Sequence, residues 1–291
     1  MNTPAPQRIH EALHDEAGFF FYGAALLDAG QTPYQSFEVW NSPLLGTFFR
    51  LDGAFMTSER DEFFYHENLI HPAAITHPEP RNALIIGGGD GGAAEELLKH
   101  PSIEHVSLVE LDGKVIEIAR THLQAVHRGA LDNPRLRIHV TDGLNFVRQT
   151  APRAGERFDL IILDLTDPVG PAAELYTEAF LRDCKALLTP GGAMTLHVGA
   201  PFFHPDRVRQ HIADLDQVFH QVTPLFVHIP LYGALWGMAI ASDTLDPLAL
   251  TASEVEARIR ARGLAELQYY NGNTHHALAA LPNYIRQLLG R

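Results

Sequence analysis

The fold class of this chain is indicated by residues 82–100, NALIIGGGDGGAAEELLKH. The apolar run at its start is typical of a buried strand, and it leads into six residues of which five are glycine. Strand, glycine-rich loop and helix in this order form the first unit of a Rossmann-like nucleotide-binding fold. The pattern G-x-G-x-x-G falls on Gly87, Gly89 and Gly92, where the absence of a Cβ allows close approach to a ligand.

The rest of the chain continues this pattern. Short apolar runs predict six further strands, at 105–109, 136–140, 158–163, 193–198, 222–230 and 238–242. Helices are expected at 114–125, 172–188, 206–219, 253–262 and at the C-terminus, and a glycine-flanked loop at 232–237. The predicted fold class is therefore α/β, with a Rossmann-like, seven-stranded methyltransferase-type sheet that carries helices on both faces.

The residues before this sheet differ in composition. Aromatic and β-branched residues alternate with turn formers from Gly18 to about Glu62, which predicts a small antiparallel β-domain. A helix is expected at 59–71, followed by a stiff linker at 77–80. The predicted domains, listed along the chain of 291 residues, are a loosely held arm at 1–17, a β-rich N-terminal domain with its connecting helix at 18–78, and a Rossmann-like catalytic domain at 79–291.

Composition narrows the partners and the compartment. The formal charge is −13, from 22 basic and 35 acidic residues, which disfavours nucleic acid as a partner. Cys184 is the single cysteine, so an intramolecular disulfide is impossible and a reducing compartment is the simplest assignment. Neither a membrane-spanning stretch nor a signal-peptide core is apparent. We therefore expect a cytoplasmic protein without a membrane or nucleic-acid partner.

One motif points elsewhere and is rejected. Residues 10–14, HEALH, match the HExxH zinc-protease pattern, which requires a long helix to present both imidazoles to one metal. Pro4 and Pro6 precede it and Gly18 follows, so such a helix is not expected. We predict no metal site.

Acidic residues follow consecutive predicted strands. The segment FDLIILDLTDPVGP at 158–171 places Asp164 and Asp167 after a buried strand, at the sheet edge where α/β proteins bind ligands. Two carboxylates on a proline-stiffened loop suit a cationic or proton-donating substrate. Glu110 occupies the position where a ribose is held, and Asp142 could accept a hydrogen bond from an adenine amino group. Each of these two acids could alternatively cap a helix.

Asp90 inside the glycine loop narrows the choice of nucleotide. A carboxylate about 4 Å from a phosphate or a second carboxylate costs roughly 4 kcal/mol at an effective dielectric of 20. This disfavours NAD, and it favours an adenosyl ligand whose tail is positively charged and lacks a carboxylate.

The motifs also carry a family resemblance. LIIGGGDGG, ERDEFFYHE, VELD, Asp142-Gly143, DLTDPVGPA and the tract from YYN to LP resemble the spermidine synthase (polyamine aminopropyltransferase) family, in order from about Gln35 to Pro282. That family transfers an aminopropyl group from decarboxylated S-adenosylmethionine to a diamine, usually putrescine, and releases methylthioadenosine. The resemblance implies a co-substrate in place of a cofactor, and a homodimer or homotetramer.

The resemblance also implies roles for individual residues. Asp164 would be the catalytic base, assisted by Tyr65 and Tyr232. Pro171 would lie in a loop that closes over the donor. The residues implied to contact the donor are Gln35, His66, Asp90, Glu110, Asp142 and Gly143. The residues implied to hold the amine are Tyr65, Asp164, Asp167 and Tyr232, with Trp236 as a wall of the pocket.

Three stretches depart from the usual family sequence: Met56, residues 197–203 and residues 233–236. The last two are expected at the far end of the acceptor. The acceptor therefore remains open among putrescine, cadaverine, a longer polyamine and another amine.

The implied reaction is a direct displacement in which a neutral amine attacks the methylene beside the sulfonium. Deprotonating an alkylamine of pKa near 10.4 at pH 7 costs about 4.6 kcal/mol, which a general base such as Asp164 can offset. Asp167 and Tyr65 would orient the amine. The alternatives are an S-adenosylmethionine-dependent methyltransferase, a non-catalytic polyamine-binding protein and, third, an NAD-dependent oxidoreductase.

Overall fold

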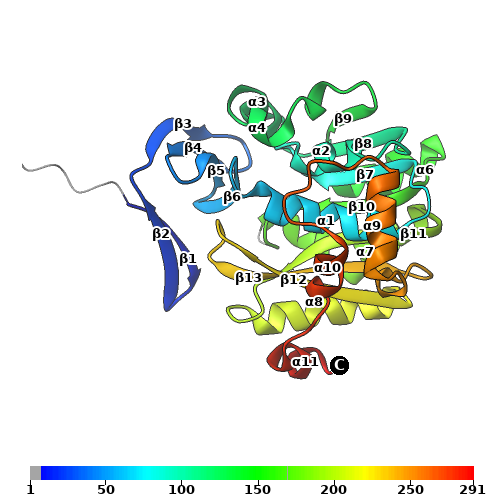
Figure 1. The fold of residues 1–291 in the computed structure, drawn as a ribbon. Helices are drawn as coiled ribbons and strands as arrows, with labels where there is room; N and C mark the ends of the chain where they lie inside the picture. Colours follow the sequence, from blue (N-terminus) through cyan, green and yellow to red (C-terminus); the bar gives the residue numbers. More distant parts are fainter. Residues whose placement is uncertain (1–7, 169) are drawn as a thin grey trace, which may run out of the picture.

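The computed structural model describes residues 8–168 and 170–291 of the chain. A large α/β unit forms most of the molecule, and the N-terminal strands lie on one side of it (Figure 1). None of the helices in these two ranges is long and apolar enough to cross a membrane.

The central sheet has seven strands, as predicted, in the order β12-β13-β11-β10-β7-β8-β9. The strands from β11 to β9 in this order are parallel, whereas β13 and β12 are antiparallel additions at one edge. Their bounds are β7 (Asn82–Gly87), β8 (His105–Glu110), β9 (Leu136–Val140), β10 (Phe158–Asp164), β11 (Leu188–Gly199), β12 (Gln221–Ile229) and β13 (Ala234–Ser242).

Both faces of this sheet are covered by helices, because alternate strand residues point to opposite sides. Ile85 belongs to a core shared with the first group of helices, and Ile86 to a core shared with the second. The first group contains α1 (Glu62–Thr76), α2 (Gly92–Leu98), α3 (Gly113–His122), α4 (Gln124–His127), α9 (Ala252–Ala261) and α10 (Gly272–Leu278). The second contains α5 (Gly143–Asn145), the π-helical turn η2 (Phe146–Thr150), α6 (Ala151–Ala154), α7 (Glu178–Leu187), α8 (Pro205–Val218) and α11 (Asn283–Leu289).

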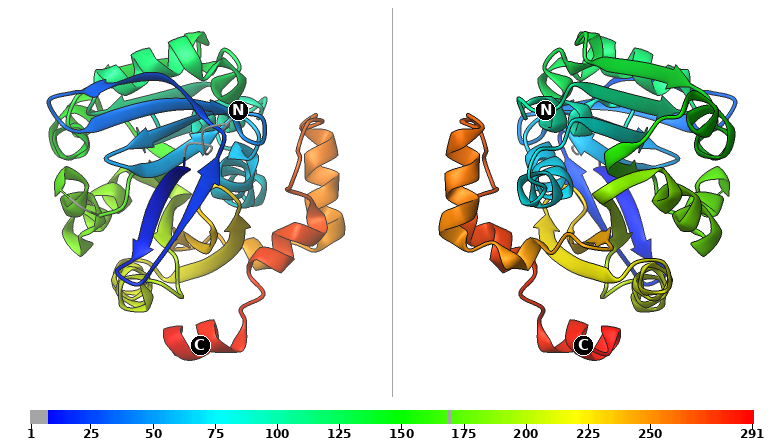
Figure 2. Two further views of the ribbon diagram at one scale, coloured as in Figure 1. Left: turned by 90° about the vertical axis from the view of Figure 1, so that its left-hand side faces the viewer. Right: turned by 90° about the vertical axis from the view of Figure 1, so that its right-hand side faces the viewer.

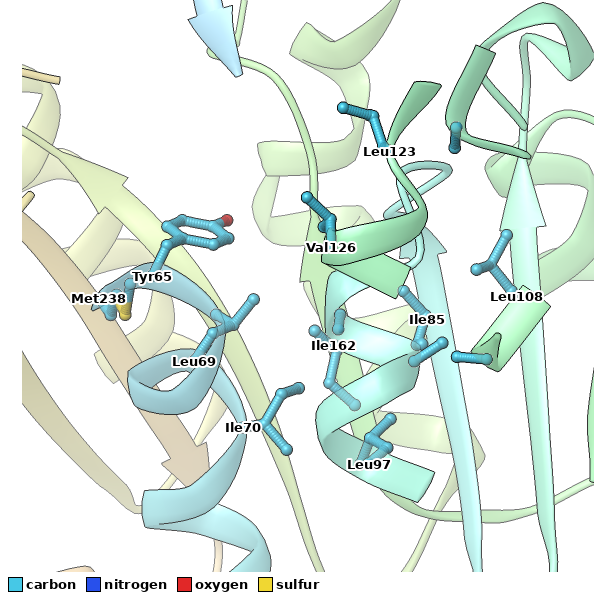
Figure 3. Packing of buried hydrophobic residues seen from close by; sticks show 14 of the residues in the cluster. Tyr65, Leu69, Ile70, Ile85, Leu97, Leu108, Leu123, Val126, Ile162 and Met238 are labelled. Atoms are coloured by element: carbon cyan, nitrogen blue, oxygen red, sulfur yellow. The ribbon is translucent and has the colours of Figure 1, made fainter. Parts of the chain in front are cut away.

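Helix α1 is held firmly on the first face. Leu69 and Ile70 of α1 pack with Leu97 of α2 and Ile162 of β10, all at most 1% exposed (Figure 3). Each such side chain contributes roughly 1.5–3 kcal/mol through burial. The helix was predicted to end at His71, before a proline, but it continues through Pro72 to Thr76. This packing fixes the residues at its N-terminal end.

The N-terminal part contains two small antiparallel sheets, which confirms the predicted β-domain. A four-stranded sheet contains β3 (Ala25–Gln31), β4 (Ser36–Ser42), β5 (Gly46–Leu51) and β6 (Ala54–Ser58). Asp52 and Gly53 join β5 to β6 with φ values of 45° and 82°, as a tight hairpin turn requires. The core of this sheet is continuous with the core around α1.

The structure differs from the loosely held arm expected at 1–17. Arg8–His14 form strand β1, which pairs with β2 (Ala17–Tyr22) in a hairpin; residues 1–7 lie outside the described part. Both prolines, at positions 4 and 6, precede this strand in the sequence. The HExxH residues therefore lie on a strand, which is incompatible with the helix that the zinc-protease pattern needs.

Two further predictions were wrong in detail. The helix expected at 172–188 is a 3₁₀ segment η3 (Gly170–Tyr176) followed by α7, because Thr177 caps a new helix through the Phe180 amide. The loop expected at 232–237 is strand from Ala234 onward, paired with β12 on one side and β11 on the other. Two short 3₁₀ segments complete the description, η1 (Ala130–Asp132) and η4 (Pro247–Ala249).

The C-terminal region is tied back to α1. The carboxylate of Glu67 accepts hydrogen bonds from the backbone amides of Gln268, Tyr269 and Tyr270 at 2.6–2.8 Å, and Glu67 is only 1% exposed. Beyond this contact the chain runs to α11 at the edge of the molecule (Figure 2).

Candidate active site

The acidic residues that follow the strands meet at one edge of the sheet. Asp164 ends β10 directly beside Gly87 of β7, and its carbonyl accepts the Gly88 amide at 2.8 Å. Glu110 ends β8, the next strand, and Asp90 lies in the loop after β7. Because β7, β8 and β10 are parallel neighbours, their carboxyl ends bring these side chains together as predicted.

The glycine loop makes room for the protein's own side chains. A Cβ on Gly88 would lie 2.8 Å from Asp164 Oδ2, and one on Gly89 would lie 2.8 Å from Glu110 Oε2. A Cβ on Gly92 would lie 2.2 Å from Cε1 of the His66 ring. The missing Cβ atoms were expected to admit a ligand, and the protein's own site residues already require glycine at these positions.

Asp164 is prepared to accept a proton. Its Oδ2 atom is buried and has no hydrogen-bond partner among the described residues. Burial raises the pKa of Asp164 to about 6, and the negative charge of Asp90 acts in the same direction. His66 and the nearby hydroxyl of Tyr65 oppose this shift. A carboxylate of this pKa is ionised at pH 7 yet more basic than an ordinary aspartate.

His66 is a buried cation between carboxylates. Its Nδ1 lies 2.9 Å from Glu62 Oε2, and its Nε2 lies 3.7 Å from Asp90 Oδ2. Burial alone would lower the pKa of this imidazole, but the carboxylates of Asp90, Glu62 and Asp164 outweigh it and raise the pKa to about 10. The single positive charge of His66 therefore offsets only part of the negative charge of these three carboxylates.

The same cluster is the candidate for a metal. Ligand atoms of His66, Asp90 and Asp164 lie within 4.8 Å of one another, the single group of this kind among the described residues. A protonated imidazole has no lone pair for a metal ion. While His66 is protonated, the group therefore offers a metal only the carboxylates of Asp90 and Asp164.

Gln35 links the small β-domain to the acidic edge. Its amide donates to Asp112 Oδ2 at 3.1 Å, and Thr32 donates to the same oxygen at 2.7 Å. Asp112 also caps α3 and donates its amide to Glu110 Oε1 at 2.9 Å. Burial raises the pKa of Glu110 to about 7. Gln35 is therefore connected to Glu110 through Asp112 and lies at the edge of the predicted donor site.

Asp142 caps a helix, which was the alternative to adenine binding considered for it. Its Oδ1 accepts the Leu144 amide at 2.9 Å and so caps the short helix α5. Gly143 is buried, and a Cβ there would lie 2.8 Å from Ile86 Cγ2. Capping occupies one carboxylate oxygen and leaves donor binding through the other a prediction. Pro171 lies in η3, and its predicted contact with the donor is also untested.

Four aromatic rings pack against one another near Asp164. The ring centroids of Tyr65 and Tyr232 are 6.0 Å apart, those of Tyr232 and Trp236 are 4.9 Å apart, and those of Trp236 and His197 are 5.6 Å apart. The His197 ring in turn lies 6.4 Å from the Tyr65 ring. The Tyr232 hydroxyl donates to the Met56 carbonyl at 2.7 Å. This arrangement suits an aliphatic chain with a charged end.

The loop after Asp164 is pinned by His197 and Tyr176. The Tyr176 hydroxyl lies 2.6 Å from His197 Nε2 and donates to the Thr166 carbonyl at 3.1 Å. His197 Nε2 also lies 2.9 Å from the Leu165 carbonyl. Burial lowers the pKa of His197, so the ring is neutral. These contacts fix the backbone between Asp164 and Asp167.

Asp167 is already paired. Its Oδ2 accepts a hydrogen bond from Arg207 Nη1 of α8 at 2.6 Å. Glu11 of β1 lies nearby: burial raises its pKa to about 7, and the charge of Asp167 contributes to the rise. Glu11 Oε2 accepts the Phe55 amide at 2.5 Å. Two carboxylates and one guanidinium thus lie close together beyond the loop after Asp164.

Comparisons of this chain with known proteins agree with its fold, its glycine loop and its acidic edge. Residues 62–249 match the spermine/spermidine synthase domain. The chain belongs to the spermine/spermidine synthase family. It is 48% identical over 279 residues to the polyamine aminopropyltransferase of Nitrosomonas europaea, a match covering 96% of this chain and 85% of that protein. It is 40% identical over 264 residues to polyamine aminopropyltransferase 2 of Hyperthermus butylicus, covering 90% and 85%.

Solved structures of the family agree. A spermidine synthase in complex with the transition-state analogue AdoDATO has a TM-score of 0.89 and 34% identity, covering all of this chain and 98% of that one. The spermidine synthase of Thermotoga maritima has a TM-score of 0.88 at the same identity, covering 100% and 97%. The resemblance drawn from the motifs, the fold class and the enzyme class, a polyamine aminopropyltransferase, are confirmed.

The family domain contains every predicted site residue except Gln35. Three neighbours of these residues were missed. Tyr176 and Arg207 were placed only in expected helices, and Glu11 was noticed only within the rejected HExxH match. A local pattern could not have revealed Arg207, since its partner Asp167 is 40 residues away.

Proposed function

We propose that this synthase-family enzyme transfers the aminopropyl group of decarboxylated S-adenosylmethionine to putrescine, giving spermidine and methylthioadenosine. The observation that carries the proposal is the buried oxygen of Asp164, which has no hydrogen-bond partner among the described residues and lies near the four aromatic rings and the acidic edge. A site with unmatched negative charge beside an apolar wall favours a molecule that is both aliphatic and cationic.

The donor would lie along the ends of β7, β8 and β9. Glu110 would hold the ribose, Asp142 and Gly143 the adenine, and Gln35 would support this edge through Asp112. Asp90 and His66 would face the aminopropyl tail. Asp90 disfavours a tail that carries a carboxylate, and this separates the decarboxylated donor from S-adenosylmethionine itself.

The acceptor would lie along the four aromatic rings with its attacking nitrogen at Asp164. Tyr65 and Tyr232 would orient the amine, Trp236 would cover its methylene groups, and Asp167 would hold the far nitrogen. Asp164 takes a proton as the neutral amine attacks the methylene next to the sulfonium, and the neutral thioether leaves. Holding both substrates in one site lowers the entropic barrier to the displacement.

The test is an acceptor panel. Purified protein is incubated with decarboxylated S-adenosylmethionine and putrescine, cadaverine, spermidine or no amine, and products are identified by mass spectrometry. We expect spermidine and methylthioadenosine in equal amounts with putrescine as the best acceptor. A methyltransferase would instead bind S-adenosylmethionine at least as tightly as the decarboxylated form. A binding protein without catalysis would release no methylthioadenosine.

We also propose that the enzyme is a cytoplasmic homodimer or homotetramer. Large apolar side chains on the N-terminal strands support this: Phe20, Tyr22, Leu26 and Leu27 are 44–52% exposed. Clusters of this kind typically mark contacts between chains. Light scattering on the purified protein gives the number of subunits directly.

A further inference from the structure

The two carboxylates assigned to the amine are in different states. Asp164 has a buried oxygen without a hydrogen-bond partner in the described part of the chain, whereas Asp167 already binds a cation, the guanidinium of Arg207, at 2.6 Å. The attacking end of an amine would therefore find an open acceptor at Asp164. Its far end would find Asp167 occupied.

Arg207 lies in the first turn of α8, and its side chain passes beside Gly199 at the end of β11. The Arg207 side chain is 26% exposed and that of Asp167 is 39% exposed. An ion pair this accessible contributes little free energy, so the guanidinium can move into solvent at small cost.

Two carboxylates and one guanidinium meet at this position. Glu11 is close enough to Asp167 for the two to influence each other, and Arg207 supplies the opposing charge. The rings of His197 and His211 are also near Arg207, and burial lowers the pKa of both. A second ammonium that binds Asp167 therefore competes with the Arg207 guanidinium for the same carboxylate.

We propose that Arg207 is a resident cation of the far acceptor site, which the second ammonium of a diamine displaces from Asp167, and that Arg207 thereby determines acceptor specificity. The inference rests on the proposed function and refines its substrate class. A monoamine leaves the Asp167–Arg207 pair intact. A linear diamine exchanges its ammonium for the guanidinium, and a triamine brings a further ammonium toward the displaced Arg207.

The experiment compares Arg207→Gln, which keeps most of the stem, and Arg207→Ala with the wild-type enzyme. Arg209→Ala is the matched control, because Arg209 lies on the same helix and pairs with Asp206. For each protein kcat and KM are measured with decarboxylated S-adenosylmethionine and n-butylamine, putrescine or spermidine. Thermal unfolding is recorded in parallel.

Removing the guanidinium should lower KM for putrescine by a factor of about three to five, as expected for the loss of one partly exposed competing cation. The effect on spermidine should be larger, and KM for n-butylamine, kcat and the melting temperature should stay unchanged. Arg209→Ala should match the wild type for every acceptor.

Two results would overturn the inference. A higher KM for putrescine in both variants would mean that Arg207 positions Asp167 and does not compete for it, and an equal change for all three amines would exclude a role in specificity. These results leave the proposed function standing, since the wild-type enzyme still forms methylthioadenosine. No methylthioadenosine from any acceptor would remove both proposals.

Discussion

Asp164→Asn tests the proposed base with almost no change in shape. At pH 7 an amine of pKa near 10.4 is free base in only about one molecule in 2,500, which corresponds to about 4.6 kcal/mol. Asp164, with its pKa of about 6, can take the proton within the complex, and general bases of this kind contribute roughly 10²–10⁴ in rate. The variant should therefore lose at least a hundredfold, roughly, in kcat at pH 7, with donor affinity nearly intact.

The dependence on pH makes the test specific. Without the base, turnover depends on amine that is already neutral, and this fraction rises tenfold per pH unit up to about pH 10. The defect of the variant should therefore shrink between pH 7 and pH 9. Methylthioadenosine release gives the rate, and titration with decarboxylated S-adenosylmethionine gives donor affinity. Near-normal turnover at pH 7, or a defect that is the same at both pH values, would refute Asp164 as the base.

Three further predictions follow from the same geometry. Asp90→Asn removes a like charge that raises the pKa of Asp164, so the acid limb of the kcat/KM profile should move below pH 6; an upward shift would contradict this. Glu11→Gln should stabilise the fold at pH 8 by up to about 3 kcal/mol in urea unfolding: the folded pKa of about 7 exceeds the ordinary 4.5, so stability falls as pH rises through this window, and no gain should remain at pH 4. Gly92→Ala should push the His66 ring away, lower the melting temperature and weaken donor binding by about tenfold or more; unchanged calorimetric affinity would show that the ring can yield.

The main sheet could be predicted closely from the sequence because its strands are short apolar runs between turn formers. Leu136–Val140 was predicted with the observed bounds, and the strand ending at Asp164 was predicted one residue short. The acidic edge followed from this, since parallel strands end together. Hairpin strand β1 was missed because Arg8–His14 is polar and lacks the alternation of a half-buried strand.

The state of each site residue could not be predicted in the same way. The described residues leave one buried oxygen of Asp164 without a partner, pair Asp167 with Arg207 and bring Gln35 to Asp112, and all three outcomes depend on contacts between distant segments. The pKa of His66 depends likewise on three carboxylates from α1, the glycine loop and β10. Local patterns locate such residues, but only packing decides their charge and partners.

The bond between Glu67 and the C-terminal region has a consequence for control of the enzyme. Glu67 follows Tyr65 and His66 on the same helix, and three amides from residues 268–270 solvate its buried carboxylate. Loss of the residues from Gln268 onward would leave that buried carboxyl group without its three donors and loosen the first turns of α1. Tyr65 and His66, which directly precede Glu67, would be displaced, and the proposed chemistry would be lost with them.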